Sequence, residues 1–226
     1  MKSVVKFAGA AFVGSMLLSA PISAAPINVA GTCGVLAGIT ELSGAVNCTK
    51  FDSTLGALAS MSLSITGAIT GTISLTNNGS QTENVQATTS ASFFGSSLPG
   101  FTLSSPMFTA SFGTGLVVMP SNTTQNFIGL SGGGGSGAMI NNTNFGSYQA
   151  PGGGSFAFNI GTLSGLSLLG GGGNIVSAQT TNASVTAAVV YTYDTAPPPT
   201  TTPEPASMAL LGAGLLALGA MRRRRG

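Results

Sequence analysis

Residues 61–76 read Met-Ser-Leu-Ser-Ile-Thr-Gly-Ala-Ile-Thr-Gly-Thr-Ile-Ser-Leu-Thr, and this stretch decides the fold class. Apolar residues or glycine occupy every odd position, and nearly all even positions carry a hydroxyl group. A period of two is typical of a strand with one buried face and one solvated face. The alternation returns in residues 83–93 and 185–193, so we expect an all-β chain.

A turn signal follows this strand directly. Residues 77–80 read Asn-Asn-Gly-Ser, and Asn-Gly favours a tight hairpin because both residues tolerate positive φ angles. The sequence therefore predicts a meander of two or three strands around this turn. Gly67 and Gly71, inside the first strand, are expected to mark bends or bulges.

The β-rich domain is expected to span residues 26–195. Short strands separated by Gly, Asn, Ser and Pro favour an antiparallel β-sandwich of Ig-like or jelly-roll-like type. A parallel β-helix is the alternative, although no fixed repeat period supports it. The glycine runs 132–135, 152–154 and 170–173 are expected to form flexible surface loops at one end of the sandwich.

Charge is unevenly distributed along the 226 residues. Six of the seven basic residues lie near a chain end, as Lys2, Lys6 and Arg222, Arg223, Arg224 and Arg225. Residues 26–202 hold one cation, Lys50, against four acids, giving a net charge of −3. This balance argues against nucleic acid as a partner, because nothing there can neutralise a phosphate backbone.

The N-terminus has the layout of a secretory signal peptide, which we assign to residues 1–25. Lys2 and Lys6 precede an apolar helical run, 7–18, that is too short to cross a membrane. Small residues follow, and signal peptidase is expected to cut after Ala24 or Ala25.

The C-terminus carries a second targeting segment. A Pro/Thr-rich spacer, 196–202, leads to Pro203-Glu204-Pro205, an apolar stretch at 206–221 and the cluster Arg222–Arg225. Sixteen helical residues reach about 24 Å, short of the roughly 30 Å of hydrocarbon in a bilayer. This hydrophobic helix is therefore expected to act as a transient transmembrane tether to the inner membrane. The positive charges at both chain ends favour the cytoplasmic side.

This tail resembles the PEP-CTERM sorting signal of exopolysaccharide-producing Gram-negative bacteria. The resemblance implies cleavage near the motif by an exosortase, a membrane-embedded cysteine transpeptidase, and delivery to the cell surface. The alternative is an ordinary tail anchor on a proline-rich stalk, which would persist in the mature protein.

Residues 51–93 also resemble the choice-of-anchor E domain, a β-rich module of PEP-CTERM proteins. The resemblance rests on Phe51-Asp52-Ser53-Thr54-Leu55-Gly56, on the alternating strands and on residues 76–80. This family has no assigned activity, so the resemblance implies architecture and location alone.

Two glycine-containing motifs are tested for catalysis. Gly129-Leu130-Ser131-Gly132-Gly133 matches the Gly-x-Ser-x-Gly elbow, but the chain has no histidine to accept the proton of Ser131. Gly132, Gly134 and Gly137 match Gly-x-Gly-x-x-Gly without the helix and the acidic residue that a dinucleotide site needs. We therefore expect no enzyme activity and no cofactor.

The remaining polar candidates are two cysteines and four acids. Cys33 and Cys48 suit a disulfide in an exported chain, with free buried thiols as the alternative. The scattered acids predict no metal site and are interpreted as solubilising groups: Glu41, Asp52, Glu83 and Asp194.

These features are consistent with three functions. The first is a non-catalytic secreted surface protein associated with exopolysaccharide or biofilm matrix. The second is a carbohydrate-binding module, which an exposed strip of Tyr148, Tyr191 and Tyr193 would favour. The third and weakest is a secreted hydrolase, which would need two facing carboxylates.

Overall fold

The computed structural model describes residues 25–195 and 205–223, which fall in two units. One unit, Ala25–Ala196, holds all the strands, and the other contains helix α1 (Pro205–Arg223). The strands are β1 (Ile27–Gly31), β2 (Val35–Ile39), β3 (Ser43–Thr49), β4 (Phe51–Asp52), β5 (Ala57–Asn77), β6 (Glu83–Gly95), β7 (Phe108–Met119), β8 (Thr123–Asn141), β9 (Gln149–Ala150), β10 (Ser155–Gly170) and β11 (Ile175–Asp194).

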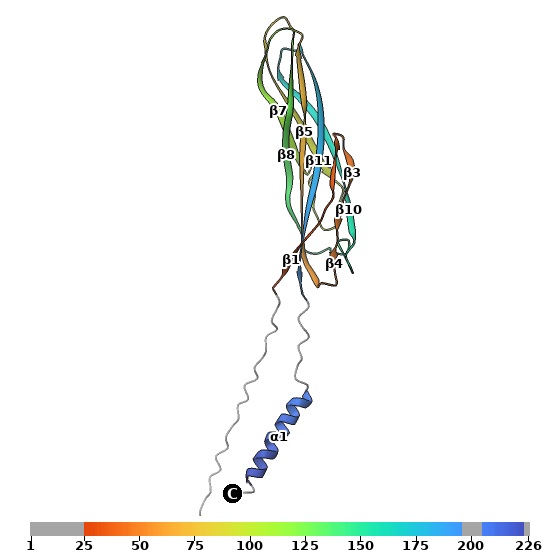
Figure 1. The fold of residues 1–226 in the computed structure, drawn as a ribbon, viewed down its shortest axis with the longest axis vertical. Coiled ribbons are helices and arrows are strands. Elements are labelled where there is room, and N and C mark those ends of the chain that lie inside the picture. Colours follow the sequence, from red (N-terminus) through yellow and green to blue (C-terminus); the bar gives the residue numbers. More distant parts are fainter. Residues whose placement is uncertain (1–24, 196–204, 224–226) are drawn as a thin grey trace, which may run out of the picture. The chain divides into compact units, whose positions relative to one another are not determined.

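The strands form two antiparallel sheets. One has the order β1-β11-β5-β8, with β2 also paired to β11, and the other has the order β3-β10-β6-β7. A short parallel pair joins β4 and β9. Figure 1 shows β5, β8 and β11 side by side along the β unit. The antiparallel sandwich is thus confirmed and the parallel β-helix is wrong, while the Ig-like or jelly-roll-like subtype stays a prediction.

Strand β11 pairs with β5 over its whole length, from Ile175 opposite Asn77 to Asp194 opposite Ala57. At the second of these ends, which we call the base, Ile27 of β1 lies opposite Tyr193. The β unit therefore begins and ends at the base. The opposite end, where β5, β7 and β10 finish, is called the tip.

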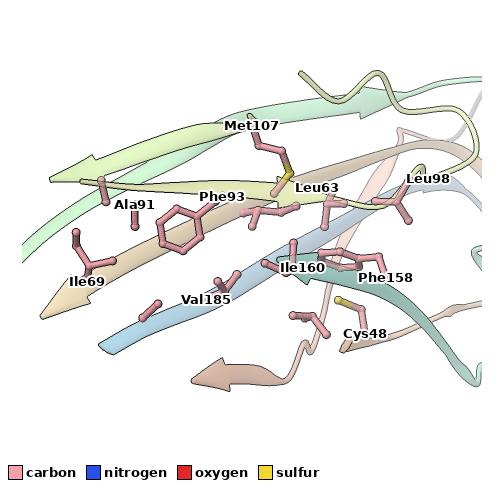
Figure 2. Packing of buried hydrophobic residues seen from close by; sticks show 14 of the residues in the cluster. Cys48, Leu63, Ile69, Ala91, Phe93, Leu98, Met107, Phe158, Ile160 and Val185 are labelled. Atoms are coloured by element: carbon pink, nitrogen blue, oxygen red, sulfur yellow. The ribbon is translucent and has the colours of Figure 1, made fainter. Parts of the chain in front are cut away.

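The core lies between the sheets and uses the odd positions of the stretch that predicted the strand. Leu63 and Ile69 of β5 are fully buried, as is Phe93 of β6 in the facing sheet. Figure 2 shows these side chains meeting residues of β10 and β11 in one layer. The sequence pattern thus identified the buried face correctly.

The two glycines of β5 are not bulged residues. A Cβ on Gly67 would come within 2.8 Å of the rings of Phe93 and Phe108, which stack at 4.7 Å. The extra residues lie on the neighbouring β8, where Gly129 and Gly137 have positive φ angles of 68° and 69°. An irregularity thus lies beside Gly71, as predicted, but its extra residue belongs to β8, and glycine at 67 and 71 makes room for neighbouring groups.

The predicted hairpin at Asn77 is wrong as well. Strand β5 lies in one sheet and β6 in the other, so the turn carries the chain across the sandwich at the tip. The buried Asn77 side chain explains this path. Its Nδ2 donates to the carbonyls of Gln81 (2.8 Å), Met119 (3.0 Å) and Pro120 (3.2 Å), and its Oδ1 accepts from Gly79 N at 2.8 Å.

One of the three predicted glycine loops is a strand. Residues 132–135 lie inside β8, paired with β5, while 152–154 and 171–173 form turns with positive φ angles. These two turns flank β10, so they lie at opposite ends of the sandwich and not at one end. Glycine is needed in β8 because a Cβ on Gly134 would come within 2.5 Å of the Thr109 carbonyl oxygen of β7.

Candidate functional site

The C-terminal candidate site includes helix α1, which is longer than the predicted 206–221. Pro205 is its first residue, a position that proline favours, and Arg222 and Arg223 lie in its last turn. Those of its apolar side chains that are described, including Leu211 and Leu216, are largely exposed. Across residues 25–195 and 205–223, no helix combines the length and the apolar character that a membrane crossing requires. The structure therefore does not support a transmembrane helix.

Several predicted site residues lie outside the described residues. They are the signal peptide up to Ala24, the spacer with Pro203 and Glu204, and the arginines Arg224 and Arg225. Ala25 is the first described residue. The two processing sites thus remain predictions from the sequence.

Cys33 and Cys48 form a disulfide across 15 residues of chain. It lies where the link between β1 and β2 meets β3. Gly34 N donates to the Asn47 carbonyl at 2.7 Å, and Thr49 N donates to the Thr32 carbonyl at 2.9 Å. The bond and these contacts join the two sheets along one side, near the base.

We expect the double substitution Cys33→Ser and Cys48→Ser to lower the free energy of unfolding by about 3 kcal/mol, because the unfolded chain regains the freedom of a 15-residue loop. Urea unfolding of the oxidised and substituted proteins measures the difference. Wild-type protein in reductant is the control and should lose the same amount. Equal midpoints for all three samples would contradict the expectation.

The outer face of the β11-β5-β8 sheet is a neutral surface rich in hydroxyl groups. Threonine hydroxyls bond across neighbouring strands in three pairs: Thr66 with Thr186 (2.7 Å), Thr72 with Thr180 (2.7 Å) and Thr76 with Thr124 (2.9 Å). Asp194, at the base, is the one charged residue of these strands. We call this surface the hydroxyl face. The hydroxyl residues of each strand can be identified in the sequence, but the sequence does not show which strands are neighbours in the sheet.

The tyrosines do not form an exposed strip. Tyr148 and Tyr191 are 1% and 2% exposed, and their hydroxyls donate to the carbonyls of Pro99 (2.8 Å) and Thr49 (2.6 Å). Burial raises the pKa of Tyr148 to about 12 and also raises that of Tyr191. Both side chains are therefore part of the hydrophobic core. Tyr193 is partly buried beside Phe51.

The four interior acids are dispersed. Asp52 bonds the backbone N–H groups of Thr54 and Gly152 at 2.9 Å each, and the Thr54 bond is the largest cause of its lowered pKa. Glu41 accepts from Ser164 N at 3.1 Å. Glu83 begins β6 at the tip, whereas Asp194 ends β11 at the base. Within the described ranges, no three His, Cys, Asp or Glu side chains gather as metal ligands would.

The two catalytic motifs lie in strand β8, and Gly129 and Gly137 stand at its two register shifts. Ser131 pairs with Thr70 in the ladder between β8 and β5, where no helix follows as a nucleophile elbow requires. Gly132 and Gly134 belong to the same ladder. These residues therefore have a structural explanation in strand pairing.

Comparison with solved structures found matches to particles of infectious bursal disease virus. The T13 particle is 12% identical with a TM-score of 0.17, covering 96% of this chain and 51% of that chain. The Gx strain is 12% identical with a TM-score of 0.17, covering 85% and 48%, and the subviral particle is 14% identical with a TM-score of 0.12, covering 89% and 50%. The chain thus spans about half the length of these proteins.

A search of curated proteins found no match. A family model described as the PEP-CTERM protein-sorting motif matches residues 201–225, which contain the Pro-Glu-Pro sequence, helix α1 and the arginine cluster. The match ends before Gly226 and does not extend into the β unit, so it bears on the tail and leaves the choice-of-anchor E resemblance unsupported. The chain therefore carries a PEP-CTERM sorting motif at its C-terminus, which marks it for export and for processing by an exosortase.

Proposed function

We propose that this chain is a non-catalytic, exosortase-sorted protein of a Gram-negative-type cell surface, associated with exopolysaccharide or biofilm matrix. The observation that carries the proposal is the sorting motif at residues 201–225. In this proposal the β unit is a choice-of-anchor E-like domain and the cargo of the sorting reaction.

The proposed route has two cleavages. Signal peptidase removes residues 1–25, and the C-terminal tail then holds the exported unit beside the inner membrane. Exosortase cuts near Pro203-Glu204-Pro205 and releases the unit toward the cell surface. The cationic cluster from Arg222 onward favours retention of the tail on the cytoplasmic side.

The hydroxyl face supports contact with hydrated glycan. Its threonine hydroxyls can exchange hydrogen bonds with sugar hydroxyls, and its strands bring no charge apart from Asp194 at the base. A neutral hydroxyl surface also favours solubility, which the same protein needs in a hydrated matrix.

A carbohydrate-binding module remains the alternative function. Such modules stack sugars on exposed aromatic rings, whereas Tyr148 and Tyr191 are buried and the chain has no tryptophan. A secreted hydrolase has less support, because the chain has no histidine to act as a general base. The first alternative would show as binding of sugar by the purified protein, and the second as hydrolysis of sugar by it.

Deletion of residues 203–226 tests the sorting proposal. We expect the truncated chain to lose its surface location and to collect in the periplasm or medium, because the exosortase no longer recognises it. Cell fractionation with immunodetection measures this, and the full-length chain should appear in the surface or polysaccharide fraction. Replacement of Glu83 by Gln, outside the deleted residues, is the control. Identical distributions of truncated and full-length chains would refute the proposal.

A further inference from the structure

One edge of β11 is only partly covered. On the side away from β5, β1 pairs with residues 189–193 and β2 with residues 182–186. Thr40 N extends this coverage by donating to the Thr181 carbonyl at 2.9 Å. From there to the tip, no strand of the described residues pairs with residues 175–180 on this side. A hollow of about 310 Å³ begins here, lined by Ile39, Thr40 and residues 179–182.

The open edge presents backbone groups in a regular order. Alternate residues of an antiparallel strand direct both N–H and C=O to the same side. The Thr181 carbonyl faces β2, so the N–H and C=O groups of Gln179, Ser177 and Ile175 face the same, uncovered side. These six groups form a template for one more strand, in line with β2.

The open edge lacks the features by which proteins usually prevent pairing. Charged residues, prolines, bulges and short strands protect free edges. Residues 155–193 contain no charged residue and no proline. Other edges are protected, because β1 and β2 are five residues each and the inward glycines of β8 pack on the β7 backbone.

Charges stand only at the two ends of this edge. Glu41 lies at the lower end, where its carboxylate accepts from Ser164 N. Glu83 lies at the tip, beside Gly172. Between them Val176 is 57% exposed, and the neighbouring Ile39 is 77% exposed. An occupant must therefore be an uncharged strand with small or apolar outward side chains.

We propose that the occupant is β11 of a second copy of this chain, paired antiparallel with the open edge about a two-fold axis at Ser177. Ile175 then lies opposite Gln179 of the second copy. The six backbone groups of one edge form hydrogen bonds with the six of the other. Val176 packs against Ala178 of the second copy, and the tip of each copy covers Ile39 of the other. The edge of a second copy is itself such an uncharged strand, because its outward residues, Val176 and Ala178, are apolar.

The test places a charge at the centre of the contact. We expect the full chain, kept in solution by a mild non-ionic detergent, to sediment as a dimer at about 100 µM, because a five-residue ladder gives a small interface of modest affinity. The exposed substitution Ala178→Lys should give a monomer, because the two lysines become close diagonal neighbours. Ala188→Lys, on the same face of β11 but outside the open edge, is the matched control and should remain dimeric.

Mixing supplies the second measurement. Ala178→Glu alone should also be monomeric, and an equimolar mixture of Ala178→Lys and Ala178→Glu should recover the dimer through opposite charges. Circular dichroism confirms that each variant is folded. The proposal is overturned by a monomeric wild type, by an Ala178→Lys protein that stays dimeric, or by a mixture that remains monomeric.

Discussion

Replacement of Gly132 by valine is expected to prevent folding or to lower the free energy of unfolding by at least about 3 kcal/mol. A Cβ at this position would overlap the carbonyl oxygen of Ser111 in β7. Rotation of the new side chain cannot relieve the clash, because the Cβ itself is too close to backbone. The edges of the two sheets would have to separate along β7 and β8. Expression in soluble form and urea unfolding measure the effect.

The adjacent glycine is the matched control. Gly133 faces solvent, and the nearest atom to a Cβ there is the Gly67 carbonyl oxygen at 3.5 Å. Valine at 133 is therefore expected to leave stability unchanged or to raise it slightly, because β-branched residues favour strands. Similar losses of stability for the two variants would show that residues 132–135 need glycine for a reason other than the close approach of β7.

Replacement of Asn77 by alanine is expected to cost about 4 kcal/mol of stability, because several backbone groups lose their partner together. The carbonyls of Met119 and Pro120 and the N–H of Gly79 all bond this one amide. The side chain thus connects the end of β5 to the end of β7 in the facing sheet. Thermal or urea unfolding measures the loss.

Asn78, the next residue, is exposed and provides the control. Alanine at 78 is expected to change stability by less than about 0.5 kcal/mol, as is usual for surface positions. Equal effects at 77 and 78 would mean that the turn depends on local backbone preference and not on the buried amide.

Strands β5, β6 and β11 could be predicted from sequence, but their partners could not. Alternation in residues 61–76 depends on one buried face, which is local information, and the buried residues Leu63 and Ile69 follow it. Asn-Gly predicted a hairpin because it reports backbone freedom alone. Whether the chain forms a hairpin or crosses to the other sheet depends on the hydrogen bonds of Asn77 with the carbonyls of Met119 and Pro120, which lie more than 40 residues away in the chain.

The glycine run of β8 failed as a loop prediction for a similar reason. Glycine permits a loop, but it also permits two backbones to approach closely, and only the position of Ser111 and Thr109 distinguishes the two. For the candidate sites, the sorting motif was readable because it is a linear signal near one chain end. The hydroxyl face was not, because it arises from the pairing of β5 with β11 and β8.

The register of β11 has a mechanical consequence. Its C-terminal end lies at the base, beside the first strand, and its 20 residues run from there to the tip between β5 and the short strands β1 and β2. A pull on the chain beyond Asp194, directed away from the base, acts along the axis of β11. Its hydrogen bonds are then loaded in shear, all at once, instead of being unzipped one after another. The strand that leads to the processing site is in this way the one best placed to bear tension.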